Sequence, residues 1–163
     1  MDSTEAPDEY HVKAAYLVGF SRFIESADKE GSSNIVICSA GDERMLGALQ
    51  RVVAGRIPTD QHVSLKSVDR RETVRGCTVL FVSLTKIGLL REVRKCEAGV
   101  HTLTVGDSPG FLEAGGAIEF VWAGNKIQFN ASLPAIRRSG LKLSSRMLNL
   151  ARNLRNDSNG AVR

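Results

Sequence analysis

Short apolar segments of strand length alternate with helical stretches over most of the chain, and this alternation limits the possible folds most strongly. The most continuous segment covers residues 77–82 and is typical of a central strand buried on both faces. Further strands are predicted at residues 34–38, 62–66 and 101–105. Helices are predicted before and between them, at residues 9–25, 44–53, 69–75 and 86–96. This order predicts an α/β fold, a three-layer α/β/α sandwich with a mostly parallel sheet.

The pattern changes after Val105. A glycine-rich stretch at residues 106–116 predicts a series of turns. Two strand-like segments, 117–122 and 126–131, flank Ala123-Gly124-Asn125 and predict a C-terminal antiparallel hairpin. A final helical region is predicted over residues 132–154, with an interruption at Gly140.

Length and composition bound the class of protein. The 163 residues fit one domain, predicted over residues 9–155, with flexible ends at 1–8 and 156–163. Hydrophobic residues make up 42% and charged residues 25%, which is typical of a globular protein. The net charge of +4 is diffuse, and aromatic and basic residues do not alternate, so nucleic acid is not a predicted partner. No apolar run is long enough for direct membrane insertion.

The residues that carry chemistry show no catalytic pattern. His11, His62 and His101 are scattered, and none lies beside a serine or cysteine in a recognisable nucleophile motif. We interpret His62 and His101 as surface residues of the sheet. No metal-ligand spacing and no cofactor motif is present. The sequence therefore predicts a binding protein, without cofactor or metal, and not an enzyme.

Two turns allow a functional and a structural interpretation. The segment from Ser39 to Asp42 could offer helix N-terminal amides to a phosphate, but Asp42 would repel an anion and is a typical N-cap. Asp107 follows a predicted strand, where α/β folds place functional groups, yet aspartate is equally a turn former. The structural interpretation is favoured for both turns.

Basic side chains gather near the C-terminus. Six fall within 19 residues: Arg137, Arg138, Lys142, Arg146, Arg152 and Arg155. If the region were one helix, Arg138, Lys142 and Arg146 would line one face, although Gly140 makes that continuity doubtful. The strip is either a solvated face or an anion-binding surface for a small acid, a nucleotide or an acidic protein.

Three cysteines, Cys38, Cys77 and Cys96, leave the compartment open. They lack CxxC spacing and could be small buried hydrophobic residues. The acidic, polar first residues are not a signal peptide. The protein is thus either cytosolic or exported with its signal already removed.

Four blocks, in order, resemble YfiR-like proteins. Residues 10–25 (YHVKAAYLVGFSRFIE) are similar to the family's opening helix, and residues 76–82 (GCTVLFV) resemble its central strand. Residues 101–118 match the family pattern TVSDxPGF followed by GGMI. Residues 126–130 and 137–148 (RRSGLKLSSRML) are similar to its C-terminal block.

The resemblance implies a small periplasmic α/β protein, expected as a homodimer. Such a protein represses a membrane-anchored diguanylate cyclase by binding its periplasmic sensor, and so lowers cyclic di-GMP signalling and biofilm formation. The partner could also be a sensor kinase, and the alternative function is a periplasmic sensor of a small acid or nucleotide. Under the partner-binding hypothesis, the candidate contacts are Arg22, Arg137, Lys142 and Arg146, with apolar help from Tyr16, Phe20 and Phe23.

The resemblance also implies a disulfide between Cys38 and Cys77, with Cys96 as a free thiol on a helix. Closing a loop of about 39 residues would stabilise the protein by roughly 3–4 kcal/mol. The second cysteine pair of some family members is absent, since the aligned positions are Leu112 and Glu119. Ser26-Ala27 replaces the family's Trp-Pro, and Asn130 stands where a glutamate is expected.

Overall fold

The computed structural model describes residues 5–25, 34–55, 62–70, 74, 76–95 and 101–156. Seven strands form one mixed sheet, in the spatial order β3 (His62–Val68), β2 (Asn34–Ala40), β4 (Val79–Val82), β5 (Leu103–Gly106), β6 (Ile118–Ala123), β7 (Lys126–Ser132) and β9 (Asn153–Arg155). The strands from β3 to β6 are mutually parallel, and β6 and β7 form the predicted antiparallel hairpin. A second, two-stranded sheet pairs β1 (Ile24–Glu25) with β8 (Lys142–Leu143).

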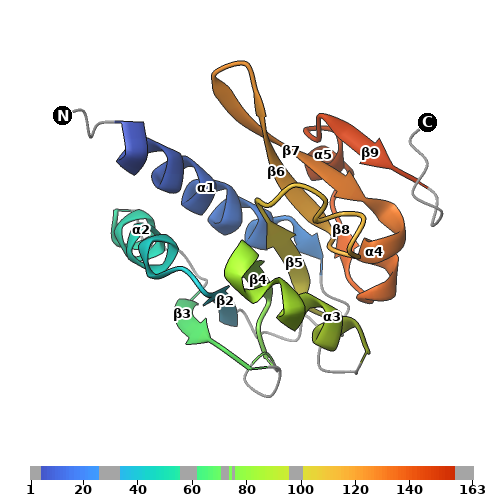
Figure 1. Cartoon of the computed structure of the whole chain (residues 1–163), viewed down its shortest axis with the longest axis horizontal. Helices are drawn as coiled ribbons and strands as arrows, with labels where there is room; N and C mark the ends of the chain where they lie inside the picture. The colour runs from blue at the N-terminus through green and yellow to red at the C-terminus, as the bar shows by residue number, and fades with distance from the viewer. Residues whose placement is uncertain are drawn as a thin grey trace.

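Helices cover both faces of the sheet (Figure 1). The helices are α1 (Glu5–Arg22), α2 (Glu43–Ala54), α3 (Ile87–Lys95), which follows the 3-10 turn η2 (Leu84–Lys86), α4 (Leu133–Arg138) and α5 (Ser145–Leu148). Leu17 of α1 and Leu49 of α2 share one core cluster with Phe81 of β4. Leu90 of α3 shares the other cluster with the neighbouring Leu80. Because successive strand residues point to opposite faces, β4 is buried on both sides.

The three-layer α/β/α prediction is therefore confirmed, with small shifts of the element ends. α1 spans Glu5–Arg22, so it begins before the predicted start at residue 9 and ends before the predicted end at residue 25. The predicted strand at residues 101–105 begins two residues later. His101 lies in a turn with φ +69°, so its predicted place on the sheet surface is wrong. Most of the predicted helix at residues 69–75 lies outside the described residues, and Asp69, Arg70 and Val74 are not helical.

The predicted interruption of the helical region 132–154 at Gly140 is confirmed, but the prediction of helix over most of the residues after it is wrong. α4 ends at Arg138, and Gly140 adopts φ +79°, a conformation that leads the chain out of the helix. Residues 142–143 then pair as β8 with β1, and α5 lasts one turn. Residues 153–155 form β9, parallel to β7, so backbone pairing overrides the helical spacing of the leucines.

Candidate functional site

An aromatic cluster fixes the second half of α1 to the β6–β7 hairpin. The rings of Phe20 and Phe129 meet edge to face with centroids 5.0 Å apart, and Tyr16 lies 5.7 Å from Phe20 and 5.6 Å from Phe120. The Tyr16 hydroxyl donates a hydrogen bond to the backbone carbonyl of Ile127 at 3.0 Å. Edge-to-face and offset aromatic pairs add to the burial energy, so this half of α1 is rigidly placed.

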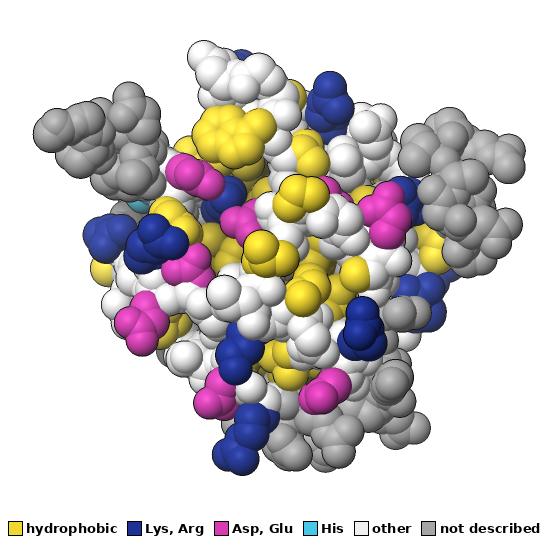
Figure 2. Space-filling view, in the orientation of Figure 1, with side chains coloured by type: hydrophobic (Ala, Val, Ile, Leu, Met, Phe, Trp, Pro, Cys, Tyr) yellow, Lys and Arg dark blue, Asp and Glu magenta, His cyan; other side chains and the backbone are white. Residues whose placement is uncertain are grey.

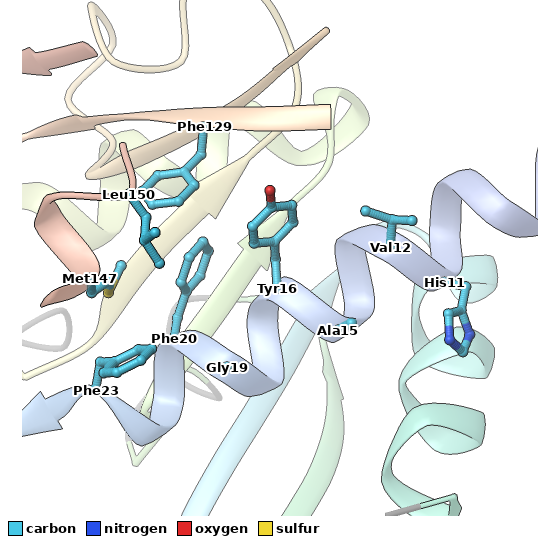
Figure 3. Close-up of a pocket in the computed structure, with 10 residues that line it drawn as sticks. All are labelled: His11, Val12, Ala15, Tyr16, Gly19, Phe20, Phe23, Phe129, Met147 and Leu150. Carbon is cyan, nitrogen blue, oxygen red and sulfur yellow. The ribbon is translucent and has the colours of Figure 1, made fainter. Parts of the chain in front are cut away.

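An apolar groove opens beside this cluster and has a volume of about 320 Å³ (Figure 3). Its lining includes Tyr16, Phe20, Phe23, Phe129, Met147 and Leu150, whose side chains converge from α1, β7 and the C-terminal segment. Phe20, Phe129 and Met147 form a buried floor, whereas Val12 is 39% and Leu150 is 64% exposed. A preformed apolar hollow with exposed aliphatic edges is typical of a surface that binds another molecule.

The backbone segments that carry three of the predicted basic residues meet beside Phe23 of this groove. In the β1–β8 pair, Ile24 is opposite Leu143 and Glu25 is opposite Lys142. The amide of Ser144 donates to the carbonyl of Phe23 at 3.0 Å, which joins the groove to the α5 segment. Arg22, Lys142 and Arg146 therefore lie on backbone that converges here. All three side chains are exposed, and none forms an ion pair within the part of the chain that the structure describes.

The rest of the basic strip is dispersed. Arg137 is exposed in the last turn of α4, and no backbone pairing joins it to the other candidates. The helical alignment of Arg138, Lys142 and Arg146 is wrong, since the three belong to α4, β8 and α5. Arg155 donates to Glu113 at 3.1 Å. On the face seen in Figure 2, basic and acidic side chains are interspersed, which agrees with a diffuse net charge.

The disulfide that the resemblance implies is present between Cys38 and Cys77, whose Cα atoms lie 6.0 Å apart. Both cysteines belong to the core cluster on the α3 face. Cys96, predicted to be free, lies outside the described residues. Among those residues, no group of three or more His, Cys, Asp or Glu side chains is placed to hold a metal ion.

The glycine-rich stretch has a packing role. A Cβ atom on Gly106 or Gly116 would lie 2.4 Å or 2.0 Å from the ring of Phe111. Phe111 is completely buried on the α3 face of the sheet. These two glycines therefore make room for an aromatic ring, which gives the stretch a packing role beside the predicted turns.

Sequence reasoning missed a buried cation in α1. Lys13 is 4% exposed, and its Nζ atom lies 2.6 Å from Glu9 and 2.8 Å from Asp107. Burial by itself lowers the pKa of Lys13, but the hydrogen bonds to Asp107 and Glu9 outweigh burial and raise this pKa above its usual 10.5. Asp107 is thus more than a turn former. The available signal was the helical spacing, which places Lys13 beside buried Ala14 and one turn before Leu17.

The N-cap prediction for Asp42 is confirmed, because its carboxylate accepts a hydrogen bond from the Arg44 amide at 3.0 Å. The same carboxylate accepts a hydrogen bond from the Tyr10 hydroxyl at 3.0 Å. Burial, followed by this hydrogen bond and the charge of Asp42, raises the pKa of Tyr10 to about 12. Tyr10 therefore ties α1 to the carboxyl end of β2, just as Lys13 ties α1 to the residue that follows β5.

Comparison with known proteins places this arrangement in a family. No curated protein matches the chain. The sequence model described as YfiR/HmsC-like matches residues 10–152, a span that contains the groove, its basic end and both bonded cysteines. The chain therefore belongs to the YfiR/HmsC-like family.

Proposed function

We propose that this protein is a periplasmic regulator that represses a membrane-anchored diguanylate cyclase by binding the cyclase's periplasmic sensor. Repression lowers cyclic di-GMP synthesis and biofilm formation. Membership of the YfiR/HmsC-like family supports the class of function, since YfiR-like proteins are regulators of such cyclases. Residues 9–155 form the regulatory unit, and the active species is a homodimer.

The apolar groove carries the proposal. Its floor is preformed by Phe20, Phe129 and Met147, so little ordering is needed when a partner side chain enters. Its edge exposes Leu150 and Val12, which gives a partner apolar surface to cover. A hollow of this kind suits an aromatic or aliphatic anchor on a helix or strand of the sensor.

The basic residues orient the bound sensor. Arg22, Lys142 and Arg146 form no ion pair with other described residues and add positive charge where β1, β8 and α5 meet beside Phe23 of the groove, so the matching end of the sensor is acidic. Charges at the rim of an interface raise the association rate and fix the direction of binding more than they add affinity. Arg137 has a smaller role, because it lies outside this convergence.

The proposed compartment agrees with the covalent chemistry. The Cys38–Cys77 disulfide is of the kind that persists in an oxidising environment such as the periplasm. None of the described helices combines the length and apolar content that crossing a bilayer requires.

The test is binding of the purified chain to the periplasmic domains of the membrane-anchored diguanylate cyclases of its own organism, measured by surface plasmon resonance. Leu150→Asp places a charge at the groove edge, and we expect affinity for the true partner to fall at least tenfold. Leu84→Asp is the matched control, because Leu84 is also 64% exposed but lies outside the groove.

Equal affinity of the two variants and the unmodified chain would contradict the role of the groove. Failure to bind any such domain, together with stabilisation by an organic acid or a nucleotide in a thermal-shift screen, would favour the alternative function as a small-molecule sensor.

A further inference from the structure

The parallel part of the sheet has a topological switch point between β2 and β4. From β2 the chain crosses through α2 to β3 on one side, and from β4 it crosses through α3 to β5 on the other side. α2 and α3 lie on opposite faces of the sheet, so the two connections separate at the carboxyl ends of β2 and β4. In open α/β sheets, ligands bind in the crevice that this separation creates.

A cavity of about 520 Å³ lies at this position, here named the switch-point crevice. Most of its polar lining comes from residues that follow three strands: Asp42 after β2, Ser83 and Thr85 after β4, and Asp107 after β5. Tyr10 of α1 completes it. This volume falls within the range of small-molecule sites, roughly 300–1,000 Å³. The crevice is separate from the apolar groove, with which it shares no lining residue.

Gly41 brings the walls of the crevice together. Its φ of +93° favours glycine, and a Cβ atom there would lie 2.3 Å from the Ser83 hydroxyl oxygen. Ser83 is itself buried, and its hydroxyl is hydrogen-bonded to that of Thr85 at 3.0 Å. The loops after β2 and β4 therefore meet closely and present fixed oxygen atoms to the cavity.

The position of the charges, and not their sum, selects the class of ligand. The lining contributes the carboxylates of Asp42, Glu43 and Asp107 and the guanidinium of Arg44, and the Lys86 side chain lies beside Gly41. Lys13 neutralises part of this charge, but it also bonds to Glu9. An anion would meet the Asp42 carboxylate at the start of α2, whereas a cation would meet carboxylates and hydroxyl oxygens.

Arg44 shows that the crevice accommodates an organic cation. Its guanidinium carbon lies 4.9 Å from the centre of the Tyr10 ring, and its Nε atom lies 3.5 Å from Asp42. An aromatic face beside a carboxylate is a typical environment for an ammonium or guanidinium group. The Arg44 side chain is 76% exposed, so it can move aside for a ligand. Among the described residues, no three His, Cys, Asp or Glu side chains are placed to hold one metal ion, so the three carboxylates of the lining do not converge on one point.

We propose that the switch-point crevice binds a small organic cation bearing an ammonium or guanidinium group. The cation contacts Asp42 and Asp107, its alkyl part lies along exposed Leu84, and it competes with Arg44 for the face of Tyr10. This site is independent of the proposed partner surface, since it involves neither the groove nor the basic residues at its end.

The test is isothermal titration calorimetry of the full chain with agmatine and putrescine as cationic probes and inorganic phosphate as the anionic probe. Asp42→Asn removes one charge and keeps a good N-cap, so the fold is retained while cation affinity falls at least tenfold. Arg44→Ala removes the internal competitor, and we expect cation affinity to rise severalfold. Glu92→Gln, on α3 outside the crevice, is the matched charge control and leaves affinity unchanged.

Three results would overturn the proposal. The first is the absence of saturable binding of either cation at millimolar concentration. The second is cation binding that Asp42→Asn leaves intact, which would put the ligand elsewhere. The third is binding of phosphate that Arg44→Ala weakens, which would make the crevice an anion site. The folded state of each variant is checked by the cooperativity of its thermal unfolding.

Discussion

The apolar groove and the switch-point crevice use the two halves of the same helix in different ways. Toward the C-terminus of α1, Tyr16 and Phe20 pack against aromatic rings of the hairpin. Toward its N-terminus, Tyr10 and Lys13 are held by carboxylates that follow β2 and β5. One half depends on burial of apolar area and the other on charge pairing, so the two regions should respond differently to mutation, salt and pH.

Phe20→Ala should have the largest effect on stability. Phe20 is 3% exposed and contacts Tyr16, Phe120 and Phe129, so its removal leaves a cavity under the groove. We expect a loss of about 3–5 kcal/mol in the free energy of unfolding, measured by urea denaturation. Val12→Ala, at the exposed edge of the groove, should cost under about 1 kcal/mol. Equal costs for the two variants would show that the aromatic cluster does not anchor α1.

Lys13→Met should have the next largest effect on stability, and it tests the charged N-terminal half of α1. The substitution keeps the length of the side chain but leaves Glu9 and Asp107 without their cation. Breaking a buried pair costs several kcal/mol, and because both carboxylates are partly exposed we expect about 2 kcal/mol. Lys126→Met, at an exposed hairpin position, is the control and should change stability little. An unchanged or increased stability of Lys13→Met would contradict the role of the ion pairs.

The stabilising effect of Lys13 should also depend on pH. Since the pKa of Lys13 is raised in the folded state, the unfolded chain loses this proton first as the pH rises. The contribution is therefore complete below about pH 10.5, the ordinary lysine value, and declines above it. Lys13→Met should show a smaller fall in stability over this alkaline range than the unmodified chain.

The contrast between the two regions also separates what sequence could predict from what it could not. The succession of strands and helices along the chain and the hairpin followed from local apolar patterns, because each strand carries its own signal in consecutive residues. Tyr16, Phe20 and Phe23 were candidate apolar contacts from the sequence, but Phe129, Met147 and Leu150 complete the groove from distant segments. The crevice was harder still, since Lys13, Asp42 and Asp107 are brought together by tertiary contacts.

In the C-terminal region, the sequence instead predicted helical structure that the chain does not form. Leucine spacing between residues 132 and 154 predicted a helical region interrupted at Gly140, and the basic residues would have lined one face only if it were continuous. The break at Gly140 is local and was predicted, whereas the pairing of β8 with β1 depends on a partner far away in sequence. The error matters for function, because it is this path that brings Lys142 and Arg146 to Phe23 and leaves Arg137 apart.

Tyr10 offers a smaller and more local test of the crevice. The chain has two tyrosines, so in Tyr16→Phe the ultraviolet titration reports Tyr10 alone, and its midpoint should lie at about 12. Asp42→Asn should move this midpoint toward 10.0, because it removes the charged acceptor of the phenol proton. Tyr10→Phe should cost about 1 kcal/mol of stability near neutral pH, as expected for one hydrogen bond.

The sign of the Tyr10 effect follows from the raised pKa. The folded state holds the proton more tightly than the unfolded chain, so the contribution of Tyr10 is complete below pH 10.0 and is lost as the pH rises to about 12. A midpoint near 10.0 in the Tyr16→Phe protein would mean that the phenol is not bonded to Asp42 in solution.

The smallest expected effect concerns the basic end of the groove. Arg146→Glu should reduce the association rate with the cyclase sensor about threefold at low salt, and the difference should shrink at high salt because exposed charges are screened. Dissociation should change little, since Arg146 lies at the rim and the apolar floor is untouched. Arg137→Glu makes the same charge change on α4, which contributes no residue to the lining of the groove, and should have a weaker effect. If the two variants slowed association equally, the overall charge of the protein and not the convergence of β1, β8 and α5 would direct the encounter.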